Sequence, residues 1–302
     1  IGALKIIAAK LIGKNTADFE ELLLTIQNSV VNNTSAKAAL DIALHDLVAK
    51  SMHQPLYKFL GGGKPELKIL TTVSVKAVAE MVSDAQLFVA QGFETLKIKV
   101  GLNPAEDIQR LKAIREAVGD SINILSDANQ GWDAKSALQI IDSLAVHNLG
   151  IAMVEQPVKA WDYANLKYVR DNSRIPIYAD ESAFNLRDVS KIIQAQMADG
   201  INIKLMKSGG LYAARPIYDL ATSHNLPCMA GCMLESPIGL AAMAAFVVGK
   251  SNIKFVDLDP IAMIKSNPVV GGVRLDGATL HLSTGAGLGI ENIQGLIPVV
   301  TI

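Results

Sequence analysis

Eight short runs of apolar residues recur along the chain at nearly constant spacing. They begin at residues 69, 95, 122, 151, 175, 201, 226 and 253, so successive starts lie 24 to 29 residues apart. Amphipathic stretches long enough for a helix separate them, as in 103–118, 134–147 and 210–224. Eight regular strand–helix repeats are typical of a parallel β/α barrel. An open, doubly wound sheet is the alternative, although it requires no such regularity.

The segments on either side of these runs follow other patterns. Apolar residues at helical spacing over 35–50 predict a helix, and the glycine-rich stretch 61–65 predicts a break in the chain. After Pro260 come Gly-Gly and Asp-Gly pairs between short alternating runs, which predict β-hairpins. We therefore expect three parts: a helical segment at 1–66, a barrel at 67–260, and a tail at 261–302 that packs with the first segment as a second domain.

Composition narrows the class of protein. The 302 residues carry a net charge of −1, which gives no electrostatic argument for binding nucleic acid or an anionic membrane surface. The apolar stretch 237–248 has the length of a buried core helix rather than of a membrane span. The two cysteines, Cys228 and Cys232, lie in an apolar context and predict buried thiols and no disulfide scaffold. With no visible signal peptide, a cytoplasmic location is expected.

Acidic residues end three consecutive apolar runs. Asp127, Glu155 and Asp180 would meet above the barrel, where this fold places its active site. Unpaired carboxylates would repel one another there, and a hard divalent cation with oxygen ligands resolves that conflict. Mg²⁺ is the preferred ion, with Mn²⁺ as a substitute. The alternative for each acid alone is a salt bridge or a helix cap.

Lysines flank these acids on both sides. Lys97 and Lys99 share one face of the second run, and Lys204 lies on the sixth. A nearby metal cation and other lysines would lower the pKa of Lys99 and Lys204, so that each can accept a proton. Two bases on opposite sides of the barrel mouth predict a proton leaving one face of a substrate and returning on the other. The alternative is that three lysines neutralise three acids without any metal.

The eighth run ends in a further pair of acids. Asp257 and Asp259, two positions apart on a strand, would share a face and suit a substrate ammonium group. The alternative is that either residue merely ends a strand before Pro260.

Several motifs, in order along nearly the whole chain, resemble those of the enolase superfamily in its muconate-lactonizing subgroup. They are AALDIALHDLVAK…PLYKFLGG at 38–62, the KxK of Lys97 and Lys99, SDANQGW at 126–132, VEQP at 154–157, ADES at 179–182 and IKLMKSGG at 203–210. The resemblance implies a modified TIM-type (β/α)7β barrel with an α+β capping domain. It also implies Mg²⁺ ligands at Asp127, Glu155 and Asp180, and catalytic bases at Lys99 and Lys204.

The DxD of Asp257 and Asp259 is similar to that of the dipeptide epimerases. That similarity implies a 1,1-proton transfer through an enediolate, which inverts the α-carbon of the C-terminal residue of a dipeptide such as L-Ala-D/L-Glu. It also implies a substrate site formed by Lys97, Asp257, Asp259, Thr72 and Met233, and a homo-oligomer. N-acylamino acid racemase, o-succinylbenzoate synthase, muconate cycloisomerase and a non-catalytic relative are the alternatives.

One expected segment is not in the sequence as given. The resemblance implies a β-rich capping segment, with a mobile loop that closes over the substrate, ahead of Ile1. The preferred side chains of the substrate are therefore not predicted.

Overall fold

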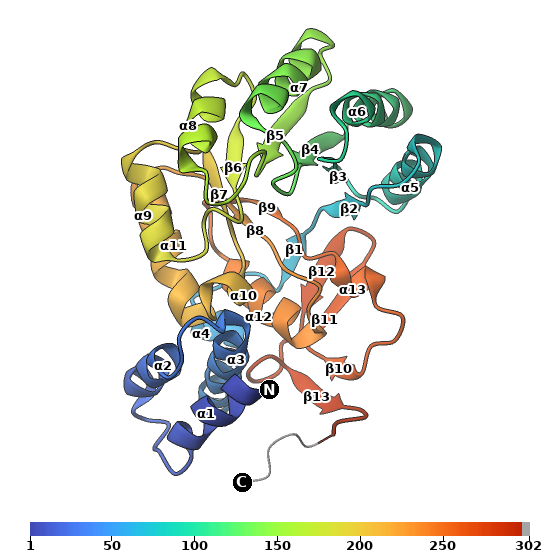
Figure 1. Ribbon diagram of the computed structural model, residues 1–302. Coiled ribbons are helices and arrows are strands. Elements are labelled where there is room, and N and C mark those ends of the chain that lie inside the picture. Colours follow the sequence, from blue (N-terminus) through green and yellow to red (C-terminus); the bar gives the residue numbers. More distant parts are fainter. Residues whose placement is uncertain (298–302) are drawn as a thin grey trace.

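Eight parallel strands form one curled sheet in the computed structural model, which describes residues 1–297 (Figure 1). Each strand pairs with the next along the chain, and each overlaps one of the eight apolar runs, so the predicted barrel-type fold is confirmed. The strands are β2 (Thr71–Val73), β3 (Thr95–Lys99), β4 (Asn123–Asp127), β5 (Ile151–Glu155), β6 (Ile177–Ala179), β7 (Gly200–Ile203), β8 (Cys228–Ala230) and β9 (Ile253–Val256).

The first and last strands of this sheet also meet. The backbone amide of Leu70, just before β2, donates to the carbonyl of Val256 at the end of β9, at 2.8 Å. Inside the curled sheet a small apolar cluster fills the space below the strand ends, which makes the interior a packed core rather than a pore. Its members are Leu70, Leu125, Met153, Tyr178 and Met229, with Ala152 and Phe255 packed against them.

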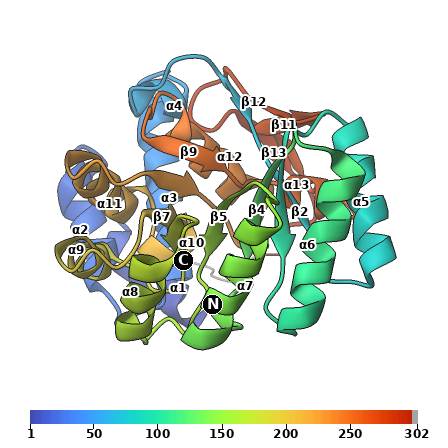
Figure 2. The same ribbon diagram turned by 90° about the horizontal axis from the view of Figure 1, so that it is seen from above.

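Helices cover the outside of the sheet (Figures 1 and 2). Side-chain oxygens at their N-termini satisfy free backbone amides, as Asn103, Asp133 and Asn185 do, and so fix where these helices begin. The helices are α5 (Val78–Ala90), α6 (Pro104–Val118), α7 (Ala134–Val146), α8 (Tyr163–Asn172), α9 (Leu186–Gln194), α11 (Leu211–Ser223) and α12 (Pro237–Val247).

Two details follow the sequence closely. The helix α12 is buried along almost its whole length, as its apolar composition predicts. After β9 comes only the single turn α13 (Pro260–Met263), so no eighth amphipathic helix closes the last repeat.

A further single turn, α10 (Leu205–Ser208), follows β7 directly. No helix among residues 1–297 is both long and apolar enough to cross a membrane.

The helices before residue 60 and the strands after residue 268 lie on the same side of the barrel (Figure 1). The strand β1 pairs with β12 of the C-terminal hairpin, and Leu288 N donates to Asp46 Oδ1 at 2.6 Å. One large hydrophobic core includes residues of both the helical segment and the barrel, so the division into domains stays a prediction. The elements are α1 (Gly2–Leu11), α2 (Phe19–Asn28), α3 (Thr34–Ser51), α4 (Leu56–Phe59), β1 (Glu66–Lys68), β10 (Val269–Gly271), β11 (Val273–Asp276), β12 (Thr279–Leu282) and β13 (Ile290–Ile293).

Gly200 on β7 makes room for an aromatic ring in the barrel interior. A Cβ atom at Gly200 would come within 2.4 Å of the Tyr178 ring, which the surrounding core prevents from moving freely. We expect Gly200→Ala to lower the free energy of unfolding by about 1–3 kcal/mol, measured by urea denaturation. Gly63→Ala, whose added Cβ meets no atom within 4 Å, is the matched control. Equal urea midpoints for Gly200→Ala and Gly63→Ala would contradict the close packing of the Tyr178 ring against Gly200.

Candidate active site

The three predicted acids converge at the carboxyl ends of neighbouring strands. Asp127 is the last residue of β4, Glu155 is the last of β5, and Asp180 directly follows β6. The strand register pairs Asp127 with Glu155, and all three side chains are buried. Parallel pairing of the strands therefore brings together residues that lie 28 and 25 positions apart in the sequence.

Lys97 lies at the centre of this acidic cluster. Its ammonium group contacts the Asp257 carboxylate directly and lies 3.6 Å from Asp127 and 3.7 Å from Glu155. Burial lowers the pKa of Lys97, but the charges of Asp257, Glu155 and Asp127 outweigh it and hold the pKa well above its usual value. Lys97 therefore remains a cation.

The two predicted bases lie on opposite sides of the acids. Lys99, at the end of β3, donates to Asp127 Oδ2 at 2.5 Å and to Asn129 Oδ1 at 2.7 Å. Lys204, directly after β7, donates to Asp180 Oδ2 at 2.7 Å. The acid-bearing strands β4, β5 and β6 lie between β3 and β7 in the sheet. Two amines thus approach the cluster from two directions, which is the arrangement that a two-base proton transfer needs.

The sequence predicts a lowered pKa for Lys204 beside a metal cation, whereas the protein's own charges raise it. Burial does lower the pKa of Lys204, but the charges of Asp180 and Glu155 outweigh it, and the net shift is upward. Asp180 Oδ2 lies 2.7 Å from this ammonium, and the attraction of the carboxylates outweighs the repulsion by Lys97.

Two buried residues of the site received no role from the sequence. Lys207 on α10 donates to Asp180 Oδ1 at 2.5 Å and to the carbonyl of Asn202 at 2.9 Å. The side chain of Asn202, on β7, donates to Glu155 Oε1 at 2.6 Å. The sequence could have indicated Asn202, because it is a polar residue within an otherwise apolar strand. Burying a polar group is costly unless it has a partner.

The acids supply oxygen donors of the kind that Mg²⁺ prefers. Within residues 1–297 no group of three acidic, histidine or cysteine side chains already forms a metal cage. Lys99 pairs with Asp127, and Lys204 and Lys207 pair with Asp180. Neutralisation by lysines thus accounts for those two acids. Glu155 is neutralised less completely: Lys97 Nζ lies 3.7 Å from its Oε2 atom, which is buried without a hydrogen-bond partner. Burial and the charge of Asp127 raise the pKa of Glu155 to about 7. The donor set therefore fits a divalent cation.

The two acids of the DxD motif have different surroundings, contrary to the prediction that they share a strand face. The strand β9 ends at Val256, so Asp257 and Asp259 lie beyond it, where strand alternation no longer applies. Asp257 pairs with Lys97, and its Oδ1 atom is buried without a partner. Asp259 Oδ2 accepts a 2.6 Å hydrogen bond from the backbone amide of Thr72. Burial, with the charge of Asp257, raises the pKa of Asp259 to about 6.

The last two predicted substrate contacts lie at the edge of the site. Thr72 meets Asp259 through its backbone. Met233, in the loop after β8, has an exposed side chain, and its amide donates to Glu235 Oε1 at 3.2 Å. The Oε2 atom of Glu235 is buried without a partner. Glu235 is thus a further acid near the mouth, in the same loop as Met233.

Glu235 makes a testable contribution to stability. Burial raises the pKa of Glu235 from 4.5 to about 7. Because the folded protein holds this proton more tightly than the unfolded chain, stability is lost as pH rises from 4.5 through 7. We expect Glu235→Gln to exceed the native chain in stability at about pH 8 by on the order of 3 kcal/mol, with the gain shrinking towards about pH 5. Thermal unfolding across pH measures this.

The control for this titration is an exposed acid. Glu116→Gln on α6 removes a carboxylate from the surface and should change stability little at either pH. A stability gain for Glu235→Gln that does not depend on pH would contradict the assignment.

Known families match both parts of the chain. The model "Mandelate racemase / muconate lactonizing enzyme, N-terminal domain" matches residues 3–61, and "Enolase C-terminal domain-like" matches residues 80–294. The L-Ala-D/L-Glu epimerase of Clostridium acetobutylicum is 43% identical over 288 residues, which are 95% of this chain and 80% of that protein.

Solved structures agree with this assignment. A substrate-liganded complex of the L-Ala-D/L-Glu epimerase from Bacillus subtilis superposes with a TM-score of 0.94 at 42% identity, over 96% of this chain and 81% of that one. The dipeptide epimerase of Enterococcus faecalis, in complex with Mg and L-Leu-L-Tyr, gives a TM-score of 0.93 at 38% identity, over 96% and 82%. The chain therefore belongs to the enolase superfamily, in the branch of mandelate racemase and muconate lactonizing enzyme.

Proposed function

We propose that this chain is a Mg²⁺-dependent dipeptide epimerase, which inverts the α-carbon of the C-terminal residue of a free dipeptide. The observation that best supports the proposal is the placement of Lys99 and Lys204 on opposite sides of one cluster of oxygen donors. An α-carbon held between two amines can lose its proton to one and regain a proton from the other on the opposite face. The three relatives described above are named as L-Ala-D/L-Glu or dipeptide epimerases, which supports the same substrate class.

Each residue has a defined task in this reaction. Lys99 and Lys204 move the α-proton at their Nζ atoms, and Lys97 stabilises the negative charge that develops on the substrate carboxylate. Asp127, Glu155 and Asp180 would hold a divalent cation, which would polarise that carboxylate and offset the acidic charge that raises the pKa of Lys204.

The acids after β9 select the other end of the substrate. Asp257 keeps one buried carboxylate oxygen without a partner, which is available to accept from an ammonium group. Asp259 is fixed by the backbone of β2 and adds negative charge beside it. Racemases of N-acylamino acids and related cycloisomerases act on substrates without a free ammonium, so these acids favour dipeptides over them.

A library of free dipeptides, incubated in D₂O with Mg²⁺ or Mn²⁺ and analysed by mass shift and chiral chromatography, tests the proposal. We expect deuterium at one α-carbon together with inversion there. N-succinyl amino acids serve as the comparison substrates. Deuterium exchange in the N-succinyl amino acids alone would show that dipeptides are not the substrates. No exchange in any substrate would favour a non-catalytic protein. Light scattering on the same sample tests the proposed homo-oligomer.

Asp259→Asn separates substrate selection from the chemistry of proton transfer. We expect the Michaelis constant for a free dipeptide to rise by about tenfold or more, because the ammonium loses one charged neighbour. The rate for an N-succinyl substrate, which has no ammonium, should not fall in the same way. If the Michaelis constant for free dipeptides does not change, Asp259 does not bind the substrate ammonium.

A further inference from the structure

Asp107 on α6 is fully buried, and its carboxylate accepts hydrogen bonds from three donors. The Oδ2 atom accepts from the backbone amide of Gly101 at 2.9 Å and from the indole of Trp132 at 3.1 Å. The Oδ1 atom accepts from the guanidinium of Arg110 at 2.8 Å. Gly101 lies two residues beyond Lys99, whereas Trp132 belongs to the loop after β4. One buried carboxylate therefore connects the loop after β3 to the loop after β4.

The same two loops contact each other directly through their backbones. A Cβ atom at Gly131 would lie 2.2 Å from the carbonyl oxygen of Gly101. A Cβ atom at Gly101, whose φ is +104°, would lie 2.3 Å from the carbonyl oxygen of Ala128. This close approach leaves no room for a side chain at either glycine. The loop after β3 is therefore packed closely against the loop after β4, and the bond to Asp107 holds it there.

Lys99 lies at the end of β3, beyond the part of that strand that pairs with β2. The register of β2 with β3 ends one residue earlier, so within residues 1–297 the strand partner of Lys99 is Asp127 of β4 alone. The amide of Val100 donates to the Asp127 carbonyl at 2.9 Å, and the amide of Gly101 donates to Asp107. Asp107 thus helps to fix the backbone directly after Lys99.

The acids of the cluster and the second lysine have other support. Three backbone hydrogen bonds of 2.8 to 3.1 Å join the end of β4 and its loop to the end of β5 and its loop. They run from the amides of Ala128, Gln130 and Trp132 to the carbonyls of Glu155, Gln156 and Pro157. Lys204 follows β7, farther along the sheet, and bonds to Asp180. Loss of Asp107 should therefore disturb Lys99 more than the acids or Lys204.

We propose that Asp107 is a positioning residue for Lys99, which fixes the loop after β3 so that Lys99 Nζ stays directed at one face of the substrate. Proton transfer requires the base to lie within hydrogen-bond reach of the α-hydrogen, and a misplacement of about 1 Å can cost about 10²-fold in rate. Asp107 acts through the backbone and does not itself move the proton. The inference rests on the proposed epimerase function and adds a residue outside its acids and lysines.

Asp107→Asn tests the proposal, because an amide cannot replace this carboxylate. All three partners of the carboxylate are donors, so the NH₂ group of asparagine faces a donor whichever way the amide is turned. The measurement is α-proton exchange of each dipeptide enantiomer in D₂O with Mg²⁺, and Lys99→Met shows which enantiomer depends on Lys99. We expect that enantiomer to exchange about tenfold more slowly in Asp107→Asn, and the enantiomer that faces Lys204 to change little.

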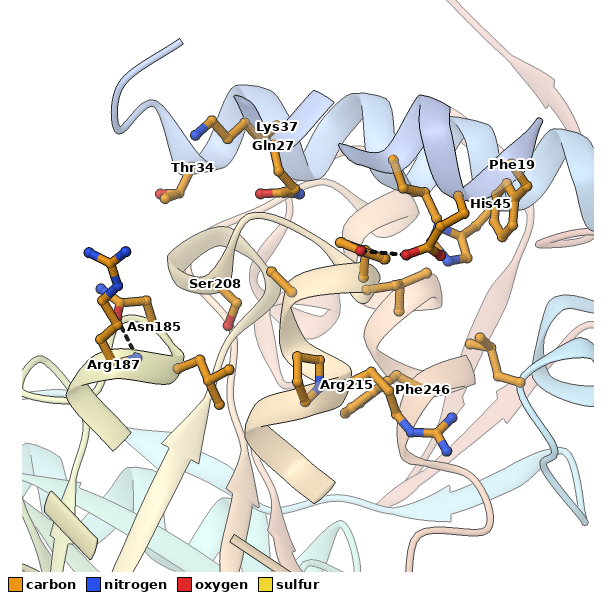
Figure 3. Close-up of a pocket in the computed structure, with 18 of the residues that line it drawn as sticks. Phe19, Gln27, Thr34, Lys37, His45, Asn185, Arg187, Ser208, Arg215 and Phe246 are labelled. Atoms are coloured by element: carbon orange, nitrogen blue, oxygen red, sulfur yellow. Dashed lines mark hydrogen bonds between the residues drawn. The ribbon is translucent and has the colours of Figure 1, made fainter. Parts of the chain in front are cut away.

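Asp41→Asn is the matched control. Asp41 on α3 is equally buried and accepts from the amides of Leu211 and Tyr212 at 2.6 and 3.2 Å. These two residues line a separate cavity between the N-terminal helices and the barrel, whose lining includes neither Lys99 nor Gly101 (Figure 3). We expect Asp41→Asn to lower the melting temperature without selectively slowing the enantiomer that depends on Lys99.

Trp132→Phe is a second test, because it keeps an aromatic ring and removes one of the two donors to Asp107 Oδ2. It should change the ratio of the two exchange rates in the same direction by a smaller factor, and it decides the matter if circular dichroism shows that Asp107→Asn does not fold. The positioning role is overturned if folded Asp107→Asn slows both enantiomers equally or neither, or if Asp41→Asn gives the same selective loss. No exchange by the native chain with any dipeptide would instead contradict the proposed function, and the positioning role with it.

Discussion

Replacing either lysine of the proposed base pair is expected to abolish epimerisation but to spare α-proton exchange in one enantiomer. Lys99 and Lys204 approach the acidic cluster from opposite sides, so each faces only one side of a substrate α-carbon. In Lys99→Met, the enantiomer whose α-hydrogen points towards Lys204 still exchanges with solvent, while the other does not. Lys204→Met gives the reverse pattern. Loss of a positioned base lowers the rate by about 10²–10⁴-fold.

The measurement is proton NMR of each dipeptide enantiomer in D₂O, together with chiral chromatography for inversion. The fold should survive both changes. Without Lys99, Asp127 still accepts from the Asn129 amide at 3.0 Å, and without Lys204, Asp180 still pairs with Lys207 at 2.5 Å. Lys254→Met, an exposed lysine on β9, is the control. A variant that loses exchange of both enantiomers equally would contradict the assignment of one lysine to each face.

The fold could be predicted because apolar runs recur at regular intervals along the chain. Parallel strands buried on both faces need continuous apolar runs, and each return to the sheet needs a helix of similar length. Residues such as Asp127 and Glu155 stand at the ends of those runs, so the same period that predicts the strands also predicts that these acids meet. The lysines of β3 followed from strand alternation, since Lys97 and Lys99 both reach Asp127.

The rule that side chains alternate between the two faces of a strand gave a wrong prediction where the strand had already ended. Because β9 stops at Val256, the spacing of Asp257 and Asp259 does not report a shared face. Lys207 was missed for a related reason: the turn of α10 directs it back to Asp180, and no strand pattern describes that turn. The direction of the Lys204 pKa shift depends on which charge lies nearest, and that distance exists only in three dimensions.

Glu155→Gln is expected to remove the response of the protein to Mg²⁺ while leaving the fold intact. Glutamine keeps the shape of glutamate and can still accept from the Asn202 side chain, which donates to Glu155 Oε1 at 2.6 Å. It removes a buried charge that lies among other acids and has one oxygen without a partner. Without metal, the variant should therefore be as stable as the native chain or more stable.

Mg²⁺ should raise the melting temperature of the native chain, because an ion that binds only the folded form stabilises it by about 2.7 kcal/mol at a hundredfold excess over its dissociation constant. The same titration should shift Glu155→Gln far less, and epimerisation should fall by about 10²-fold or more, since charge that develops on the substrate carboxylate loses its stabilisation. Glu181→Gln removes the acid next to Asp180 and outside the predicted ligand set, and it should keep both responses. If Glu155→Gln keeps the full Mg²⁺ shift and Glu181→Gln loses it, the metal binds elsewhere. Because the thermal shift needs no substrate, this result tests the ligand set even if the preferred dipeptide is not in the library.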